Sequence, residues 1–176
     1  MKRELDEALC AKYPLIFKDR NADMRTTAMC WGFDCGDGWY NLIDTLCYYL
    51  TSEYNQAKCG YDSIKDKVDQ PLWQGSNKIV TQKQIDDAKE KLELEEAKVP
   101  VAVQVKEKFG GLRFYVQGAT DKHYNYISFA EGMSYRICEE CGSTGKTYTD
   151  GWHRTLCDIH AAMDGREVEY EYEENE

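Results

Sequence analysis

Four residues near the C-terminus have the types and the spacing of metal ligands. Cys138 and Cys141 form a Cys-x-x-Cys pair followed by Gly142, and fifteen residues separate this pair from the Cys-x-x-His pair of Cys157 and His160. Zn²⁺ prefers four tetrahedral nitrogen and sulfur ligands, and two closely spaced pairs on separate turns supply them. Since four protein ligands leave no open position for water, we predict one structural Zn²⁺ ion. The alternative is that these thiols are ordinary cysteines of a reduced protein.

The segment around these residues resembles a zinc ribbon or a treble clef. Gly145 and Asp150-Gly151 suit a small hairpin between the two ligand pairs. Large apolar side chains are few, and metal binding contributes roughly 10–16 kcal/mol to the folding of zinc-finger peptides. We therefore expect the ion to stabilise this module and to take no part in catalysis.

A second group of candidate ligands lies in the run CWGFDCGDGW, residues 30–39. Cys30 and Cys35 would need two more ligands to bind a second metal ion, and packed or exposed thiols are the alternative. Asp34 and Asp37 can bind a hard cation, but acids in glycine-rich loops more often cap helices or form turns. A metal-dependent hydrolase centred here is the weakest hypothesis, because no phosphate-binding loop, dinucleotide-binding turn or serine nucleophile elbow is present. We predict that the protein is not an enzyme.

Residues 101–109 show the clearest strand pattern, with valines alternating with other residues. Gly110-Gly111 follows, and LRFYV then continues the alternation. Both glycines can adopt positive φ, so we predict a hairpin whose two-residue turn pairs Phe109 with Leu112.

A cationic and aromatic cluster is predicted on the outer face of this hairpin. It consists of Lys106, Lys108, Arg113 and Tyr115. Such a cluster on an acidic protein can hold a phosphate-bearing ligand or an acidic partner surface. The alternatives are a solvated sheet face, or a face covered by the acidic helix at 81–97.

The remaining pattern is helical. Helices are predicted over residues 2–12, 41–54, 82–98 and 120–137, and a long loop is predicted over 57–80. Asp37 is a candidate N-cap for the second helix, and Thr81 with Gln84 forms a capping box for the third. The predicted fold class is α+β, with helices packed on a small antiparallel β-hairpin sheet and a C-terminal zinc-ribbon or treble-clef-like module. The predicted division is an α+β domain at 1–136, a zinc-binding module at 137–165 and an acidic tail at 166–176.

Composition limits the partners and the compartment. The chain has 22 Lys+Arg against 32 Asp+Glu, a net charge of −10, which argues against direct nucleic-acid binding and favours a basic partner. The start, MKRELDEALCAKYP, lacks the apolar core of a signal peptide, and no run of 18 apolar residues occurs. We expect a cytoplasmic protein without membrane contact whose eight cysteines are reduced.

Three segments together resemble a family of small proteins encoded by phages and prophages. They are CGDGWYNLID, VKEKFGGLRFYV and CEECG…TLCDIH, and the KFGGLRFY hairpin is the most specific. No catalytic residue is carried over from this family. The resemblance implies a host-cell setting in which small acidic proteins inhibit host defence, as anti-CRISPR proteins do. The leading hypothesis is a protein that binds and inhibits a basic host effector such as a CRISPR nuclease. The alternative is a sponge for a small phosphate-bearing ligand such as a signalling nucleotide.

Overall fold

The computed structural model describes residues 1–168, so the predicted acidic tail lies largely outside the described residues. The described part is α+β, as predicted. Its helices are α1 (Arg3–Lys12), η1 (Ala28–Trp31), η2 (Asp37–Trp39), α2 (Tyr40–Leu50), α3 (Ser52–Asp62), α4 (Gln82–Ala97), α5 (Asp121–Ser134) and α6 (Asp158–Met163). Its strands are β1 (Phe33–Asp34), β2 (Val101–Lys108), β3 (Gly111–Gln117), β4 (Lys146–Tyr148) and β5 (Arg154–Leu156). None of the described helices combines the length and hydrophobicity that a membrane span requires.

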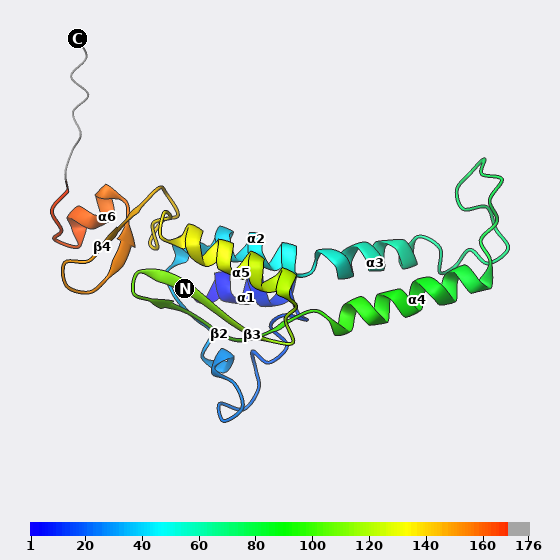
Figure 1. Ribbon diagram of the computed structural model, residues 1–176, viewed down its shortest axis with the longest axis horizontal. Coiled ribbons are helices and arrows are strands. Elements are labelled where there is room, and N and C mark those ends of the chain that lie inside the picture. The colour runs from blue at the N-terminus through cyan, green and yellow to red at the C-terminus, as the bar shows by residue number, and fades with distance from the viewer. Residues whose placement is uncertain (169–176) are drawn as a thin grey trace, which may run out of the picture.

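The body is built from α1, α2 and α5 together with the β2–β3 hairpin (Figure 1). Apolar side chains from all five elements form one buried cluster, which includes Leu9, Ile43, Val105, Phe114 and Ile127. At one end of the body lies the C-terminal module, and at the other end α3 and α4 extend outward side by side (Figure 1). The molecule is therefore elongated, with its main core in the middle.

The hairpin forms, but the predicted turn and register are wrong. The turn residues are Phe109 and Gly110, with φ of 55° and 76°, and Lys108 pairs with Gly111. Val105 consequently pairs with Phe114, two residues along β3 from the predicted partner Val116. A slip of two residues keeps each side chain on the predicted face, so the apolar pattern alone could not detect it.

The sheet has a third strand that the sequence did not reveal. β1 pairs in parallel with β2, placing Asp34 opposite Lys106, and the strand order is β1-β2-β3. On the other edge, side chains of α5 bond the amides of β3. The Leu112 amide donates to Ser134 Oγ at 2.8 Å and the Phe114 amide to Glu131 Oε1 at 2.9 Å. These contacts satisfy edge amides that would otherwise be open to pairing with another strand.

The predicted loop at 57–80 is partly helical. α3 continues to Asp62, and residues 63–80 form a loop in which Pro71 and Ile79 make an antiparallel bridge. A break separates α2 from α3 at Thr51, whose hydroxyl donates to the Cys47 carbonyl at 2.9 Å. Such back-bonding bends helices. α3 shows little apolar periodicity, and it is stabilised as a helix by packing against α4.

α3, α4 and residues 63–80 together form a projection that we call the arm (Figure 1). The predicted capping box of α4 is confirmed, since Thr81 and Gln84 bond each other's backbone amides. Ala57, Val80 and Ile85 are the buried apolar residues of the arm, and they lie outside the main core cluster. The arm is therefore a thin two-helix element whose surface is mostly exposed.

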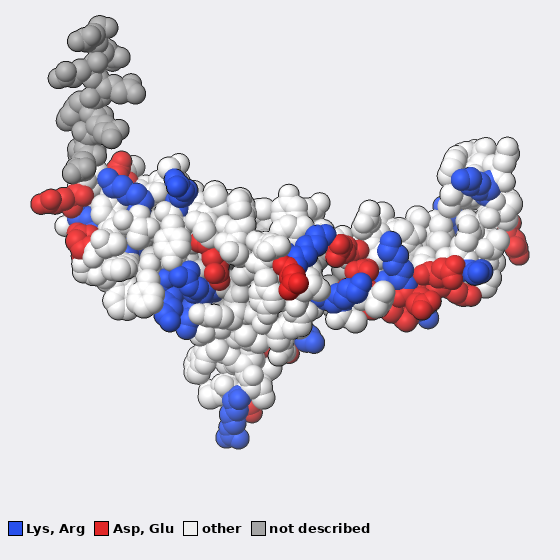
Figure 2. Space-filling view, viewed as in Figure 1, with Lys and Arg blue, Asp and Glu red and all other residues white. Residues whose placement is uncertain are grey.

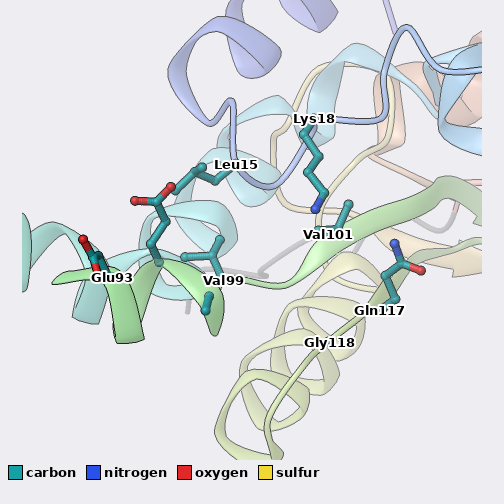
Figure 3. A pocket seen from close by; sticks show the side chains of 9 residues that line it. Leu15, Lys18, Glu93, Val99, Val101, Gln117 and Gly118 are labelled. Atoms are coloured by element: carbon teal, nitrogen blue, oxygen red, sulfur yellow. The ribbon is translucent and has the colours of Figure 1, made fainter. Parts of the chain in front are cut away.

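An open cavity of about 800 Å³ marks the place where the arm leaves the body (Figure 3). Lys18 reaches into it from the segment after α1, toward Val101 and Gln117, while Glu93 belongs to α4 (Figure 3). The cavity lies between the C-terminal end of α4 and the open end of the hairpin. The arm is thus joined to the body mainly where α3 begins and α4 ends.

The most buried ion pair of the body joins α1 to the segment after it. Asp6 is buried, and its two oxygens accept hydrogen bonds from Arg20 Nε at 3.0 Å and Arg20 Nη2 at 2.8 Å. Burial acts to raise the pKa of Asp6, but the hydrogen bonds from Arg20 and Cys10 outweigh it, so the pKa lies below its ordinary value. A carboxyl group with a depressed pKa contributes stability above its unfolded-state pKa and loses it as pH falls through the folded-state pKa.

Replacing Asp6 with asparagine is expected to lower the free energy of unfolding by about 2 kcal/mol at pH 7, because Arg20 keeps a partly buried charge without its partner. The difference from wild type should shrink below about pH 4, where the wild-type carboxyl group also becomes protonated. Denaturant unfolding of the variant and the wild type at pH 7 and below about pH 4 measures this difference in the free energy of unfolding. Glu7→Gln, which removes the exposed Arg3–Glu7 pair, is the control and should have little effect. An equal loss at the two pH values would contradict the assignment.

Candidate metal centre

The four predicted ligands lie together at the C-terminal end of the molecule. Cys138 and Cys141 lie on a tight turn after α5, closed by a hydrogen bond from the Gly142 amide to the Cys138 carbonyl at 2.8 Å. Gly142 has a φ of 80°, which glycine adopts without strain. Cys157 is the N-cap residue of α6, and His160 follows within that helix. The β4–β5 ribbon lies between the two pairs in the chain.

The ligand atoms have the spacing that a tetrahedral ion requires. All four lie within 4.8 Å of one another. Cys141 Sγ lies 3.8 Å from Cys157 Sγ, and His160 Nδ1 lies 3.6 Å from Cys138 Sγ and 3.2 Å from Cys157 Sγ. Tetrahedral Zn²⁺, with its usual bond lengths, would place two sulfurs about 3.8 Å apart and a sulfur and a nitrogen about 3.5 Å apart. The cluster can therefore hold a metal ion, and Nδ1 is the histidine atom that faces it.

The electrostatics of the turn favour thiolate at one ligand. Hydrogen bonds from the side chain and backbone of Ser143 lower the pKa of Cys141 to about 6. Burial raises the pKa of Cys138, and backbone hydrogen bonds from Cys157 and Cys141 oppose that rise. A divalent cation deprotonates a coordinating thiol outright, so a bound ion would reverse the effect of burial.

The glycine-rich loop at residues 36–39 packs directly on the first ligand turn. The Gly38 amide donates to the Glu139 carbonyl at 2.7 Å, and the Trp39 indole donates to the Ile137 carbonyl at 2.9 Å. The Gly36 amide donates to Glu139 Oε1 at 2.9 Å. Burial raises the pKa of Glu139, and the bond from Gly36 opposes that rise. We call this set of contacts the glycine clamp, and it joins the metal centre to the start of α2.

The tip of the hairpin contacts the module from the other side. Thr155 Oγ1 donates to the Gly110 carbonyl at 2.6 Å and lies 2.8 Å from Thr147 Oγ1. The module also has a small buried cluster of its own, consisting of Cys138, Tyr148, Leu156 and Ala161. The boundary predicted between residues 136 and 137 stays a prediction, because the module has its own core and yet packs on the body at two places.

Two arginines tie the ends of the module together. Arg154 bonds Glu140 and Asp164, the latter at 3.0 Å. Arg166 bonds Asp164 at 2.9 Å and Asp150 at 2.8 Å. The ion pairs therefore link the first ligand turn, the ribbon and the end of α6, and their residues were not recognised from the sequence because nothing in the spacing indicates them.

The other candidate ligands are not brought together. Among residues 1–168, the group at the C-terminal site is the one set of three or more metal-ligating side chains that lie close enough to share an ion. Cys35 is buried, and burial raises its pKa to about 12, whereas Cys30 donates to the Thr27 carbonyl. Asp37 is not the N-cap of α2. The N-cap residue is Trp39, and its side chain makes no capping hydrogen bond. The Asp37 carboxylate instead accepts the Lys2 backbone amide at 2.6 Å and pairs with the Lys2 ammonium at 3.0 Å.

The predicted cationic cluster divides into two parts. Lys106 and Lys108 lie near aromatic rings, with Lys106 Nζ 5.8 Å from the centre of the Tyr115 ring. Arg113 is already engaged, since it donates to the Leu112 carbonyl at 2.7 Å and to Tyr135 Oη at 2.8 Å. The acidic helix α4 packs on α3 and not on this face of the hairpin (Figure 1). The outer face is therefore open to solvent at Lys108 and partly open at Lys106.

Comparisons with protein-family models, with curated proteins and with solved structures found no match to this chain. A functional proposal therefore rests on the chain's own residues and their arrangement. The features that can support one are the metal centre, the arm, and the open lysines at the hairpin tip.

Proposed function

We propose that this chain is a zinc-stabilised binding protein of phage or prophage origin that inhibits a basic host defence effector, such as a CRISPR nuclease, by direct contact in the host cytoplasm. The observation that carries the proposal is the arm, an exposed element that projects from the body and includes the acidic helix α4 (Figures 1 and 2). A thin two-helix projection adds little to the main core. Its exposed surface is therefore available for a partner.

Zinc is the ion that the ligand set fits best. Three thiolates and one imidazole are soft and borderline ligands, which suit Zn²⁺ and disfavour Mg²⁺ and Ca²⁺. A shell filled by four protein side chains leaves no position for substrate, so the ion would act as a structural element. Its role in binding a partner would be to keep the C-terminal module folded.

The charge of helix α4 suits a basic partner. Acidic side chains gather along α4 (Figure 2). They are Asp86, Asp87, Glu90, Glu93, Glu95 and Glu96. A surface that normally holds a nucleic-acid backbone is strongly basic, and an acidic helix would be attracted to it over long range.

The tip of the arm adds apolar anchors to this charge. Trp73 is 59% exposed, and Val68 and Ile79 on the same loop are also exposed. Tryptophan is enriched among the interface residues that contribute most binding energy. The arm therefore combines exposed apolar residues on the loop at 63–80 with acidic residues on α4, which is the composition of a binding surface.

Trp73→Ala and Glu90→Lys are expected to weaken inhibition of the effector by at least about tenfold each, because they remove an anchor and reverse a charge on the arm. The measurement is co-elution with purified CRISPR nucleases and other defence effectors, together with assay of their activity.

Matched controls are Trp31→Ala, which removes another exposed tryptophan, and Glu4→Lys, which makes the same charge change on α1. Both should bind as the wild type does. If no purified effector co-elutes with the wild-type protein or loses activity, the proposed function is wrong. If all four variants weaken inhibition equally, the arm is not the binding surface.

A further inference from the structure

A cavity of about 440 Å³ lies between the hairpin tip and the β4–β5 loop of the C-terminal module. Lys106, Lys108 and Phe109 line it from the hairpin, and Trp152 and His153 line it from the module. Its volume lies within the range of small-ligand sites, which is roughly 300–1,000 Å³. Figure 2 shows basic side chains gathered over this end of the hairpin, beside the module.

Two aromatic rings stand exposed at the rim of this cavity. Trp152 is 75% exposed and Phe109 is 64% exposed. They come from two different loops, and Phe109 lies near His153, with 6.2 Å between ring centres and 61° between ring planes. Large flat rings that bury little of their surface contribute little to folding. They are available to stack on a planar ligand.

The backbone conformation of Phe109 is a separate observation that points to a functional role for its ring. Its φ of 55° lies in the left-handed region, where a bulky side chain is disfavoured and glycine or asparagine is usual. A strained residue persists when the surrounding structure imposes it or its function needs it. The Phe109 ring is solvent-exposed and gives little packing energy in return for the strain. The Phe109 ring is therefore held in a position where a ligand can contact it.

The two lysines supply positive charge next to the rings. Lys108 Nζ lies 5.3 Å from the centre of the Phe109 ring, and among residues 1–168 neither Lys106 nor Lys108 forms an ion pair. The carboxylate in the cavity wall, Glu107, is turned to the backbone, since its Oε1 accepts the Gly110 amide at 2.6 Å. Both ammonium groups are therefore free to meet an anion, and lysine binds phosphate as a point charge.

We propose that this cavity binds a nucleotide, with its base stacked on Trp152 and Phe109 and its phosphates at Lys106 and Lys108. Stacking of a base on an aromatic side chain contributes about 1–3 kcal/mol and tolerates different bases. An acidic peptide would satisfy the lysines and leave the rings unused. The net charge of −10 repels a long polyanion, so a free nucleotide suits the site better than a nucleic-acid strand does. The site is independent of the arm and of effector binding.

Metal-loaded full-length protein titrated with ATP, GTP or a cyclic dinucleotide, followed by calorimetry and tryptophan fluorescence, is expected to show saturable binding of at least one of them. Trp152→Ala and Lys108→Ala should each weaken that binding by about tenfold. Trp73→Ala and Lys83→Ala on the arm are the controls and should bind as the wild type does. Metal content and melting temperature show that each variant is folded, and Trp152 is exposed enough for its loss to be tolerated.

Inorganic phosphate and a five-nucleotide single-stranded oligomer distinguish the sources of the signal. Tighter binding of the oligomer than of any nucleotide, weakened by the same two variants, would overturn the choice of a free nucleotide and assign the cavity to a nucleic-acid strand. Inorganic phosphate binding as tightly as the nucleotides overturns the proposal, because the rings would then contribute nothing. Absence of saturable nucleotide binding, or binding that both variants leave unchanged, also overturns it. The effector assay tests variants of the arm, whereas the nucleotide assay tests variants of this cavity. Effector inhibition and nucleotide binding can therefore fail independently of each other.

Discussion

Removing the metal is expected to unfold the C-terminal module, and Cys141→Ser is expected to do the same by destroying one ligand. The buried core of the module is small, consisting of Cys138, Tyr148, Leu156 and Ala161. Ion binding contributes roughly 10–16 kcal/mol to the folding of small zinc modules, far more than so small a core supplies. We expect a loss of at least about 5 kcal/mol in the unfolding of the module. Metal analysis and thermal unfolding, with and without a chelator, measure it.

The matched control for this prediction is Cys59→Ser. Cys59 is an exposed thiol on α3, remote from the metal centre, so its replacement should change neither the metal content nor the melting temperature. Any loss of effector inhibition by Cys141→Ser should accompany the loss of folding and should not exceed it. Wild-type metal content and melting temperature in Cys141→Ser would show that the ligand assignment is wrong.

Gly38→Ala is expected to have the second largest effect, because no space exists for a side chain in the glycine clamp. A Cβ atom at Gly38 would lie 2.7 Å from Cys141 N and closer still to Cys138 O and Gly142 N. All three are backbone atoms of the ligand turn and cannot rotate away. We expect the variant to lose about 3 kcal/mol of stability and to bind metal more weakly.

Gly60→Ala provides the comparison, since it makes the same chemical change at a helical glycine with open space around it. Nothing lies within 4 Å of a Cβ atom at Gly60. Alanine there should stabilise α3 by about 0.5–1 kcal/mol, because it restricts the unfolded chain and favours the helix. The two variants should therefore shift the unfolding midpoint in opposite directions. Equal shifts would mean that the clamp is not tightly packed.

The cluster of candidate metal ligands could be predicted from the sequence because it depends on spacing that is local in the chain. Each pair lies on one turn, and a Cys-x-x-Cys or Cys-x-x-His spacing brings its two side chains together without any tertiary information. The glycine clamp could not be predicted in this way. Gly36 and Gly38 meet Glu139 about a hundred positions later in the chain, and nothing local in CGDGW indicates that partner.

In the hairpin, the local turn preference of the sequence competes with tertiary packing. Gly110-Gly111 is a favourable pair for a two-residue turn, yet the turn forms one residue earlier and includes Phe109. The contact of the Gly110 carbonyl with Thr155 and of Gly111 with Tyr135 places both glycines against other elements. The close approach of neighbouring groups therefore determines where these glycines lie. Tertiary packing overrode the turn preference, as it did for the helix that continues past residue 57.

The glycine clamp has a consequence for how the protein is made on the ribosome. The Trp39 indole donates to the Ile137 carbonyl, 98 residues later in the chain, and the Gly38 amide depends on Glu139 in the same way. At roughly 5–20 residues per second, these acceptors are synthesised about 5 to 20 s after their donors. Until then these donors at the start of α2 can bond only to water. The N-terminal half therefore reaches its final packing late in translation or after it, when the metal-binding turn has been made.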